Sequence, residues 1–138
     1  MKAMMVDPKA IGRVVLSHWH SDHTGGLLSF LRLRGPTAES CVVDVHPDRP
    51  IARGIAPSPN YDKIIGRLPA DPAFKEIEEL GGVVERNMLG HTVADGMVWV
   101  SGEIPRETSF EGGILGGVRW VDEPGQAGGQ WIKEEVSF

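Results

Sequence analysis

The sequence has one cysteine, no apolar run long enough to cross a membrane, and no excess of basic charge. A single thiol, Cys41, forms no disulfide within the chain, so nothing in the composition requires an oxidising compartment. The apolar patch before Asp7 is too short for a signal-peptide core. The formal net charge of -5 provides no basic surface for a phosphate backbone. We therefore expect a cytoplasmic protein that binds neither a membrane nor nucleic acid.

The length of the chain and its content of glycine and proline indicate the size of the core and the share of loops. A chain of 138 residues buries one modest core, and we predict a single domain over residues 1–138. Hydrophobic residues make up 41% of the chain, which is ordinary for a globular domain, whereas its 18 glycines and 10 prolines exceed average usage. Much of the chain should therefore lie in turns and loops.

Hydrophobic periodicity predicts alternating strands and helices. The runs typical of strands are residues 13–16, 40–47, 82–87 and 96–102. The predicted helices are residues 24–35, with Thr24 as N-cap, and 71–82, with Asp71 as N-cap and Pro72 at the first helical position. Residues 48–72 are rich in proline and predict a long loop, and no periodicity is visible after Glu111. This order of elements predicts an α/β fold with mixed strand pairing.

Residues 18–23 contain three of the five histidines and one aspartate. If the extended geometry of the preceding strand persists, alternation puts His18 and His20 on the same side. Asp22 and His23 lie one turn further on, where the backbone must turn before two glycines. Neutral imidazoles and carboxylates are ligands for zinc and related ions. We predict that these four residues face one cavity and bind a catalytic metal, rather than forming a polar loop that takes up metal adventitiously.

The segment "SHWHSDHTGG" resembles the His-x-His-x-Asp-His signature of the metallo-β-lactamase fold superfamily. The resemblance implies part of an αββα sandwich with mixed sheets, and hydrolysis by a metal-bound hydroxide of an ester, thioester, lactone or phosphoester. It implies His18 and His20 as ligands of a first ion, and Asp22 and His23 as ligands of a second. Asp22 would also act in catalysis by orienting the hydroxide. Because His20, not Glu, stands at the third motif position, zinc is the expected cofactor, as one or two ions, with manganese or iron as alternatives.

Two further segments resemble a narrower group of that superfamily. "VHPD" at residues 45–48 and "VSGEIPRETSFEGG" at residues 100–113 are similar to parts of the subgroup named after dihydropterin ribofuranosylaminobenzene phosphate synthase. The resemblance implies a small-molecule substrate. Relatives of this subgroup have additional strands before the motif and additional ligands after it, which implies that this chain is a fragment. A fragment would expose an apolar face, and we therefore expect marginal stability or association into a homo-oligomer.

Several alternatives remain open at the level of the sequence. The chain could be a catalytically incomplete remnant that binds at most one weak metal and acts as a binding or assembly module. A nuclease of the same superfamily is disfavoured by the acidic charge balance. A Ser-His-Asp hydrolase lacks support because no Gly-x-Ser-x-Gly occurs. We expect His46 and His91 to lie away from the metal, and Cys41 and Asp44 to be structural.

Overall fold

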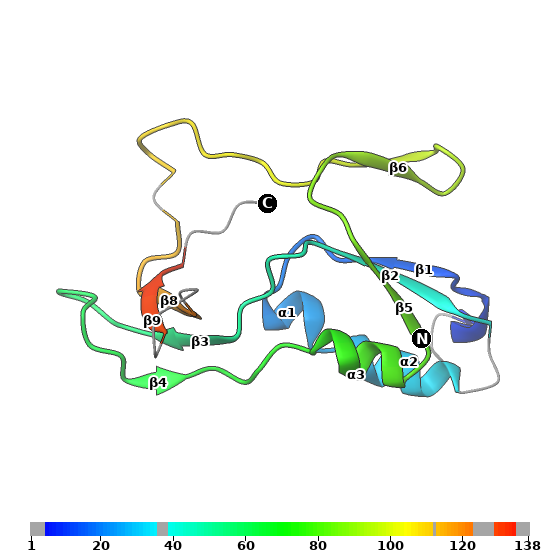
Figure 1. The fold of residues 1–138 in the computed structure, drawn as a ribbon, viewed down its shortest axis with the longest axis horizontal. Coiled ribbons are helices and arrows are strands. Elements are labelled where there is room, and N and C mark those ends of the chain that lie inside the picture. Colours follow the sequence, from blue (N-terminus) through cyan, green and yellow to red (C-terminus); the bar gives the residue numbers. More distant parts are fainter. Residues whose placement is uncertain (1–4, 36–38, 112, 123–128, 135–138) are drawn as a thin grey trace. The chain divides into compact units, whose positions relative to one another are not determined.

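A computed structural model describes residues 5–35, 39–111, 113–122 and 129–134 (Figure 1). The chain divides into two compact units. The first unit comprises residues 1–47 and 72–102, and the second comprises residues 48–71 and 103–138. The expectation of one domain over the whole chain stays a prediction.

A three-stranded parallel sheet, in the order β1-β2-β5, forms the centre of the first unit. Its strands are β1 (Arg13–Val15), β2 (Cys41–Val45) and β5 (Gly82–Arg86), and each begins within a run predicted to be a strand. The middle strand β2 alternates in the expected way, because Cys41, Val43 and Val45 are buried on one face. The other elements of this unit are η2 (Pro8–Ala10), α1 (Ser21–Thr24), α2 (Leu27–Arg34), α3 (Phe74–Glu79), β6 (His91–Val93) and β7 (Val98–Val100).

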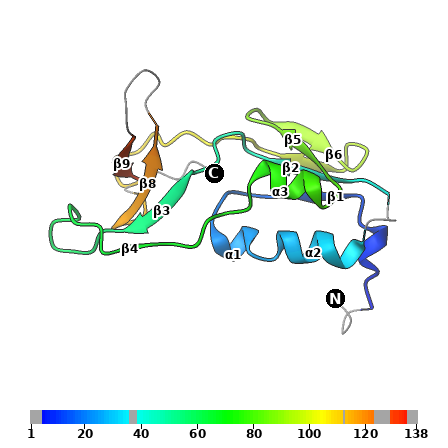
Figure 2. The same cartoon turned by 60° about the horizontal axis from the view of Figure 1, so that its bottom comes forward.

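One hydrophobic core joins α2, β2 and α3 in the first unit. Its buried members are Trp19, Leu27, Leu31, Cys41, Val43, Val45 and Ile77. Figure 2 shows α1 and α2 following each other along one side of the sheet, while the β6–β7 hairpin lies on the other side. The loop that connects β1 to α1 therefore runs along the carboxyl end of the parallel strands, which is where open α/β sheets commonly bind ligands.

Both predicted helices begin later than the sequence pattern indicated. Thr24 is not an N-cap: it ends the one-turn helix α1, and α2 begins at Leu27 after Gly26. Asp71 is not an N-cap either, because α3 begins at Phe74 and the amide of Ala73 donates to the Glu76 carboxylate at 2.8 Å.

The second unit contains a four-stranded antiparallel sheet that the sequence analysis did not predict. Its order is β4-β3-β8-β9, with β3 (Ala52–Ile55), β4 (Gly66–Arg67), β8 (Gly117–Val121) and β9 (Gln130–Lys133). The prediction of a loop over residues 48–72 was therefore wrong, and the lack of periodicity after Glu111 gave no sign of β8 and β9. These short strands depend on contacts between side chains that are distant in sequence, such as the edge-to-face pair of Trp120 and Trp131 with ring centroids 5.5 Å apart.

A buried ion cluster explains why Asp71 does not cap a helix. Its carboxylate accepts a hydrogen bond from Arg53 at 2.5 Å, and both side chains are only 3% exposed. Glu134 lies 3.6 Å from the same guanidinium. Arg53 is on β3 and Asp71 follows β4, so the ion pair joins two segments of the second unit.

The α/β class is confirmed, with several small sheets and few helices. Some large apolar side chains are exposed in the first unit, among them Met97, Val98 and Trp99 on the β6–β7 hairpin. In the part of the chain that the structure describes, no helix combines the length and apolar character needed to cross a membrane.

Removal of the Asp71 carboxylate should destabilise the second unit. The variant Asp71→Ala leaves the buried Arg53 charge without its shortest ion pair, and breaking a buried pair costs about 3 to 5 kcal/mol. Chemical denaturation measures this loss. Asp62→Ala is the matched control because Asp62 is exposed in the same unit, and it should cost less than about 0.5 kcal/mol. Equal losses in the two variants would contradict a structural role for Asp71.

Candidate metal centre

The candidate centre lies in the loop that leaves β1, and Trp19 fixes the course of that loop. The Leu16 amide still donates to the Asp44 carbonyl at 3.0 Å, as a continuation of the parallel pairing with β2. Trp19 is 5% exposed, packs edge-to-face on Phe74 with ring centroids 5.6 Å apart, and donates its indole N–H to the His46 carbonyl at 2.8 Å. The loop is therefore held to the core between the two histidines of the motif.

Because the Trp19 side chain is buried in the core, the side chains of its two neighbours, His18 and His20, lie together on the other side of the backbone. The imidazole rings of His18 and His20 lie edge to face, with centroids 4.6 Å apart. This is the geometry expected from alternation along an extended backbone. The extended φ and ψ of His20, at -82° and 148°, show that this conformation continues to the start of α1.

A single helical turn returns the chain to the same place. The His20 carbonyl accepts from the amides of His23 and Thr24, each at 2.9 Å, which closes α1. The His23 ring thereby comes to lie 4.1 Å from the His18 ring, measured between centroids, and its Nε2 atom lies 3.5 Å from Asp22 Oδ2. All four predicted ligands are therefore near one another.

Three of the four residues form a group of possible metal donors. One ligand atom each from His18, His20 and Asp22 lies within 4.8 Å of the others. Zinc holds nitrogen and oxygen ligands at about 2.0 to 2.2 Å in tetrahedral geometry, so two donors on one ion are roughly 3.4 Å apart. The donor set fits a divalent ion in kind and number, and the loop needs to contract by about 1.4 Å at most to hold it.

His23 stands beside this group. Its separation of 3.5 Å from Asp22 matches the spacing of two donors on one ion. The resemblance to the superfamily implied two separate pairs of ligands, whereas in the structure Asp22 is close to the two preceding histidines and also to His23. Asp22 and His23 have side chains that are 77% and 44% exposed, so this side of the centre is open to solvent.

The two remaining histidines lie outside the donor group as far as the described residues extend. His46 contributes its backbone carbonyl to the Trp19 anchor. His91 uses both ring nitrogens elsewhere, because Nε2 lies 2.8 Å from Asp44 Oδ2 and Nδ1 lies 3.0 Å from the Leu89 carbonyl.

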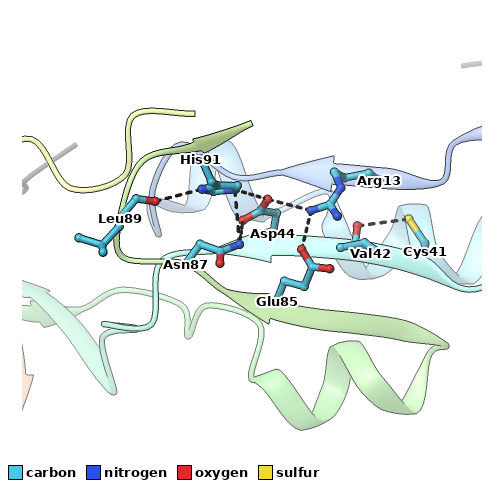
Figure 3. Close-up of polar contacts among 8 residues, drawn as sticks. All are labelled: Arg13, Cys41, Val42, Asp44, Glu85, Asn87, Leu89 and His91. Atoms are coloured by element: carbon cyan, nitrogen blue, oxygen red, sulfur yellow. Dashed lines mark hydrogen bonds and ion pairs between the residues drawn. The ribbon is translucent and has the colours of Figure 1, made fainter. Parts of the chain in front are cut away.

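Asp44 is the centre of a polar network on the sheet face opposite the core (Figure 3). Its side chain is 3% exposed and receives hydrogen bonds from Arg13 at 2.9 Å, Asn87 at 2.9 Å and His91 at 2.8 Å. Arg13 also contacts Glu85 at 2.7 Å. A buried carboxylate needs such partners, and three segments supply them. The expectation that Asp44 is structural agrees with this environment.

Each ring nitrogen of His91 lies close to an oxygen atom in this network. Its two shortest ring contacts are to oxygens that can only accept, the Asp44 carboxylate and the Leu89 carbonyl, while the Asn87 side-chain nitrogen lies 3.4 Å from Nε2. These two hydrogen bonds, the first with the larger effect, raise the pKa of His91 above its usual value. Sequence reasoning did not find this role, because no local pattern links Asp44 with a histidine 47 residues away.

Cys41 is fully buried in the core, and burial raises the pKa of its thiol. A thiol in this state is a poor nucleophile and a poor metal ligand. Its position agrees with the expected structural role.

Comparison with known proteins identifies the family. The model of the metallo-beta-lactamase superfamily matches residues 2–108, which include the complete candidate centre. The chain therefore belongs to the metallo-β-lactamase superfamily, whose members are hydrolases. Its mixed α/β architecture is consistent with part of the sandwich of that family.

A narrower similarity is to an atrochrysone carboxyl ACP thioesterase of Passalora fulva. The two sequences are 49% identical over 39 residues, which are 28% of this chain and 11% of the thioesterase. The matched part is thus a small fraction of that protein. No solved structure matches the chain.

The raised pKa of His91 should make folding stability depend on pH. Because the folded protein raises the pKa of His91, the network contributes fully below the unfolded value of about 6.5 and loses that contribution as the pH rises through the folded value. His91→Gln should therefore lower the free energy of unfolding most under mildly acidic conditions, and the deficit should shrink toward alkaline pH. Denaturant titrations across this range measure it, and a deficit that does not vary with pH would contradict a raised pKa of His91.

Proposed function

We propose that the protein is a metal-dependent hydrolase whose ion is held by His18, His20 and Asp22. The observation that carries this proposal is the convergence of these three donors within 4.8 Å in a chain of the metallo-β-lactamase superfamily. Three protein ligands with one open position are the usual arrangement of a catalytic zinc site. His23 lies next to Asp22 and is the candidate ligand for a second ion.

Each residue of the loop has a separate role in this proposal. His18 and His20 bind the ion as neutral imidazoles, and Trp19 holds the backbone between them. Asp22 orients the attacking water with its exposed carboxylate. A divalent ion, when bound, supplies a nucleophilic water at neutral pH and polarises the substrate oxygen. We propose zinc as the ion because imidazole and carboxylate donors suit it, with manganese or iron as alternatives.

The substrate in this proposal is a small ester, thioester, lactone or phosphoester. The similarity to a protein named as an acyl-carrier thioesterase supports including thioesters, although it covers only 28% of this chain. The resemblance of residues 45–48 and 100–113 supports the dihydropterin synthase-like subgroup as the nearer family branch. We further propose a cytoplasmic protein with no nucleic-acid partner, and the exposed apolar residues of the β6–β7 hairpin are compatible with a homo-oligomer.

Metal analysis tests the donor set directly. The purified protein should bind one to two zinc ions per chain, and His18→Ala combined with His20→Ala should weaken binding more than about 100-fold. The reason is that loss of even an outer partner of a ligand costs about 10- to 100-fold in affinity. Elemental analysis and competition with a chromophoric chelator measure stoichiometry and affinity.

The matched control for this experiment is His91→Gln, which removes one imidazole whose nitrogens are both engaged with other groups. It should retain the zinc of the wild type. Equal metal content in the wild type and in the double variant would reject the proposed centre. The oligomeric mass, measured on the same samples, shows whether a second copy takes part.

Hydrolysis tests the proposed activity. The zinc-loaded protein should cleave at least one member of a panel of acyl thioesters, lactones and phosphodiesters, and a chelator should abolish the turnover. Asp22→Asn should lower kcat/KM by about 100-fold or more, since a positioned proton acceptor contributes about 10²- to 10⁴-fold. Zinc binding without turnover of any substrate would favour the alternative of a catalytically incomplete metal-binding module.

A further inference from the structure

The hydroxyl of Ser17 lies between two rings of the candidate metal centre. Its Oγ atom is 3.0 Å from Nδ1 of His18 and 3.2 Å from Nδ1 of His23. These two rings come from opposite ends of the motif and are packed against each other, with centroids 4.1 Å apart. One small side chain therefore contacts the same nitrogen on two of the predicted ligands.

The valence of the hydroxyl restricts the tautomers of these rings. A serine hydroxyl has one hydrogen to donate and two lone pairs to accept. It can donate to one Nδ1 atom at most, so at least one of the two rings must carry its proton on Nδ1 and donate to Ser17. If Ser17 accepts from both rings, both carry Nδ1–H.

The tautomer decides which nitrogen can bind a metal. A neutral imidazole with Nδ1–H has its lone pair on Nε2. The Nε2 atom of His23 is the atom that lies 3.5 Å from Asp22 Oδ2, so coordination through this nitrogen brings His23 and Asp22 to one ion. Metal-binding histidines commonly donate their other N–H to an oxygen, which fixes the orientation of the ring.

We propose that Ser17 is a positioning residue, which accepts hydrogen bonds from Nδ1–H of His18 and His23 and so leaves Nε2 of both rings available to the metal centre. This inference rests on the proposed metal-dependent function. Ser17 acts through the two histidines and does not itself bind the ion. By joining residues 18 and 23, it also closes the loop around the donor group.

The loss of zinc affinity expected on removal of the Ser17 hydroxyl is at the lower end of the range for outer partners of metal ligands. Loss of such an outer partner typically weakens metal binding by 10- to 100-fold. Ser17 is exposed, so water can replace part of its contribution. We therefore expect Ser17→Ala to raise the zinc dissociation constant by about 10-fold.

The experiment compares four proteins: the wild type, Ser17→Ala, Ser17→Thr and Ser29→Ala. Threonine keeps the hydroxyl, and Ser29 is an exposed serine on α2 that lies outside the centre. Zinc affinity is measured by chelator competition. In the metal-free protein, nitrogen NMR of the ring atoms reports the tautomers of His18 and His23 directly, at one fixed pH. We expect Ser17→Thr and Ser29→Ala to bind zinc like the wild type, and both rings of the wild type to show Nδ1–H.

The outcomes separate this inference from the proposed function. Wild-type zinc affinity in Ser17→Ala would overturn the role of Ser17 while leaving the metal centre intact. Nε2–H on either ring of the wild type would overturn it without any metal measurement. If the wild type and the His18→Ala, His20→Ala variant bind zinc equally, the proposed function itself fails.

Discussion

The burial of Trp19 is the constraint on which the candidate centre depends. An extended segment places successive side chains on opposite sides, so a residue fixed in the core forces both of its neighbours outward together. Trp19 is fixed by aromatic packing on Phe74 and by a hydrogen bond to the His46 carbonyl. Both contacts come from segments that also belong to the core or border it. The burial of the Trp19 side chain thus fixes the positions of His18 and His20 on the opposite side of the backbone. A change that destabilises the core around Trp19 should therefore also disturb the donor group.

The parallel sheet sets a second condition, because β2 is buried on both faces. On the core face its side chains are apolar, whereas on the other face it carries Asp44. A carboxylate at that depth is costly unless it is paired and hydrogen-bonded. Arg13, Asn87 and His91 meet this need from β1, from the end of β5 and from β6. The same residues tie the three segments together, and the Asp44 carbonyl receives the Leu16 amide at the point where the metal loop begins.

The sequence was most informative where local pattern determines structure. Runs of β-branched residues predicted β1, β2 and β5. The spacing of the motif predicted four site residues, and the structure places these four close together. It was least informative in the second unit, whose strands contain or border glycine and proline and depend on distant pairs such as Arg53 with Asp71. Asp71 was assigned to a helix cap because Asp-Pro is a common start signal, but a buried guanidinium competed for its carboxylate. Ser17 had no signal of its own, since its role depends on rings one and six positions away that only the turn of α1 brings together.

The compactness of the motif bears on how many ions the centre can hold. His18, His20 and Asp22 come from five consecutive residues, so their approach to one another costs little additional chain ordering once the loop is formed. In the structure they are spread over as much as 4.8 Å, while Asp22 and His23 are already at ligand spacing. Asp22 is therefore close both to the two preceding histidines and to His23, and its carboxylate has two oxygens that can accept. If the centre held two ions, His18 and His20 would hold the first, His23 would hold the second, and Asp22 would be near both; one ion held by His18, His20 and Asp22 would leave His23 beside the centre. Asp22, whose exposed carboxylate is close to both groupings, is thus the residue that links them.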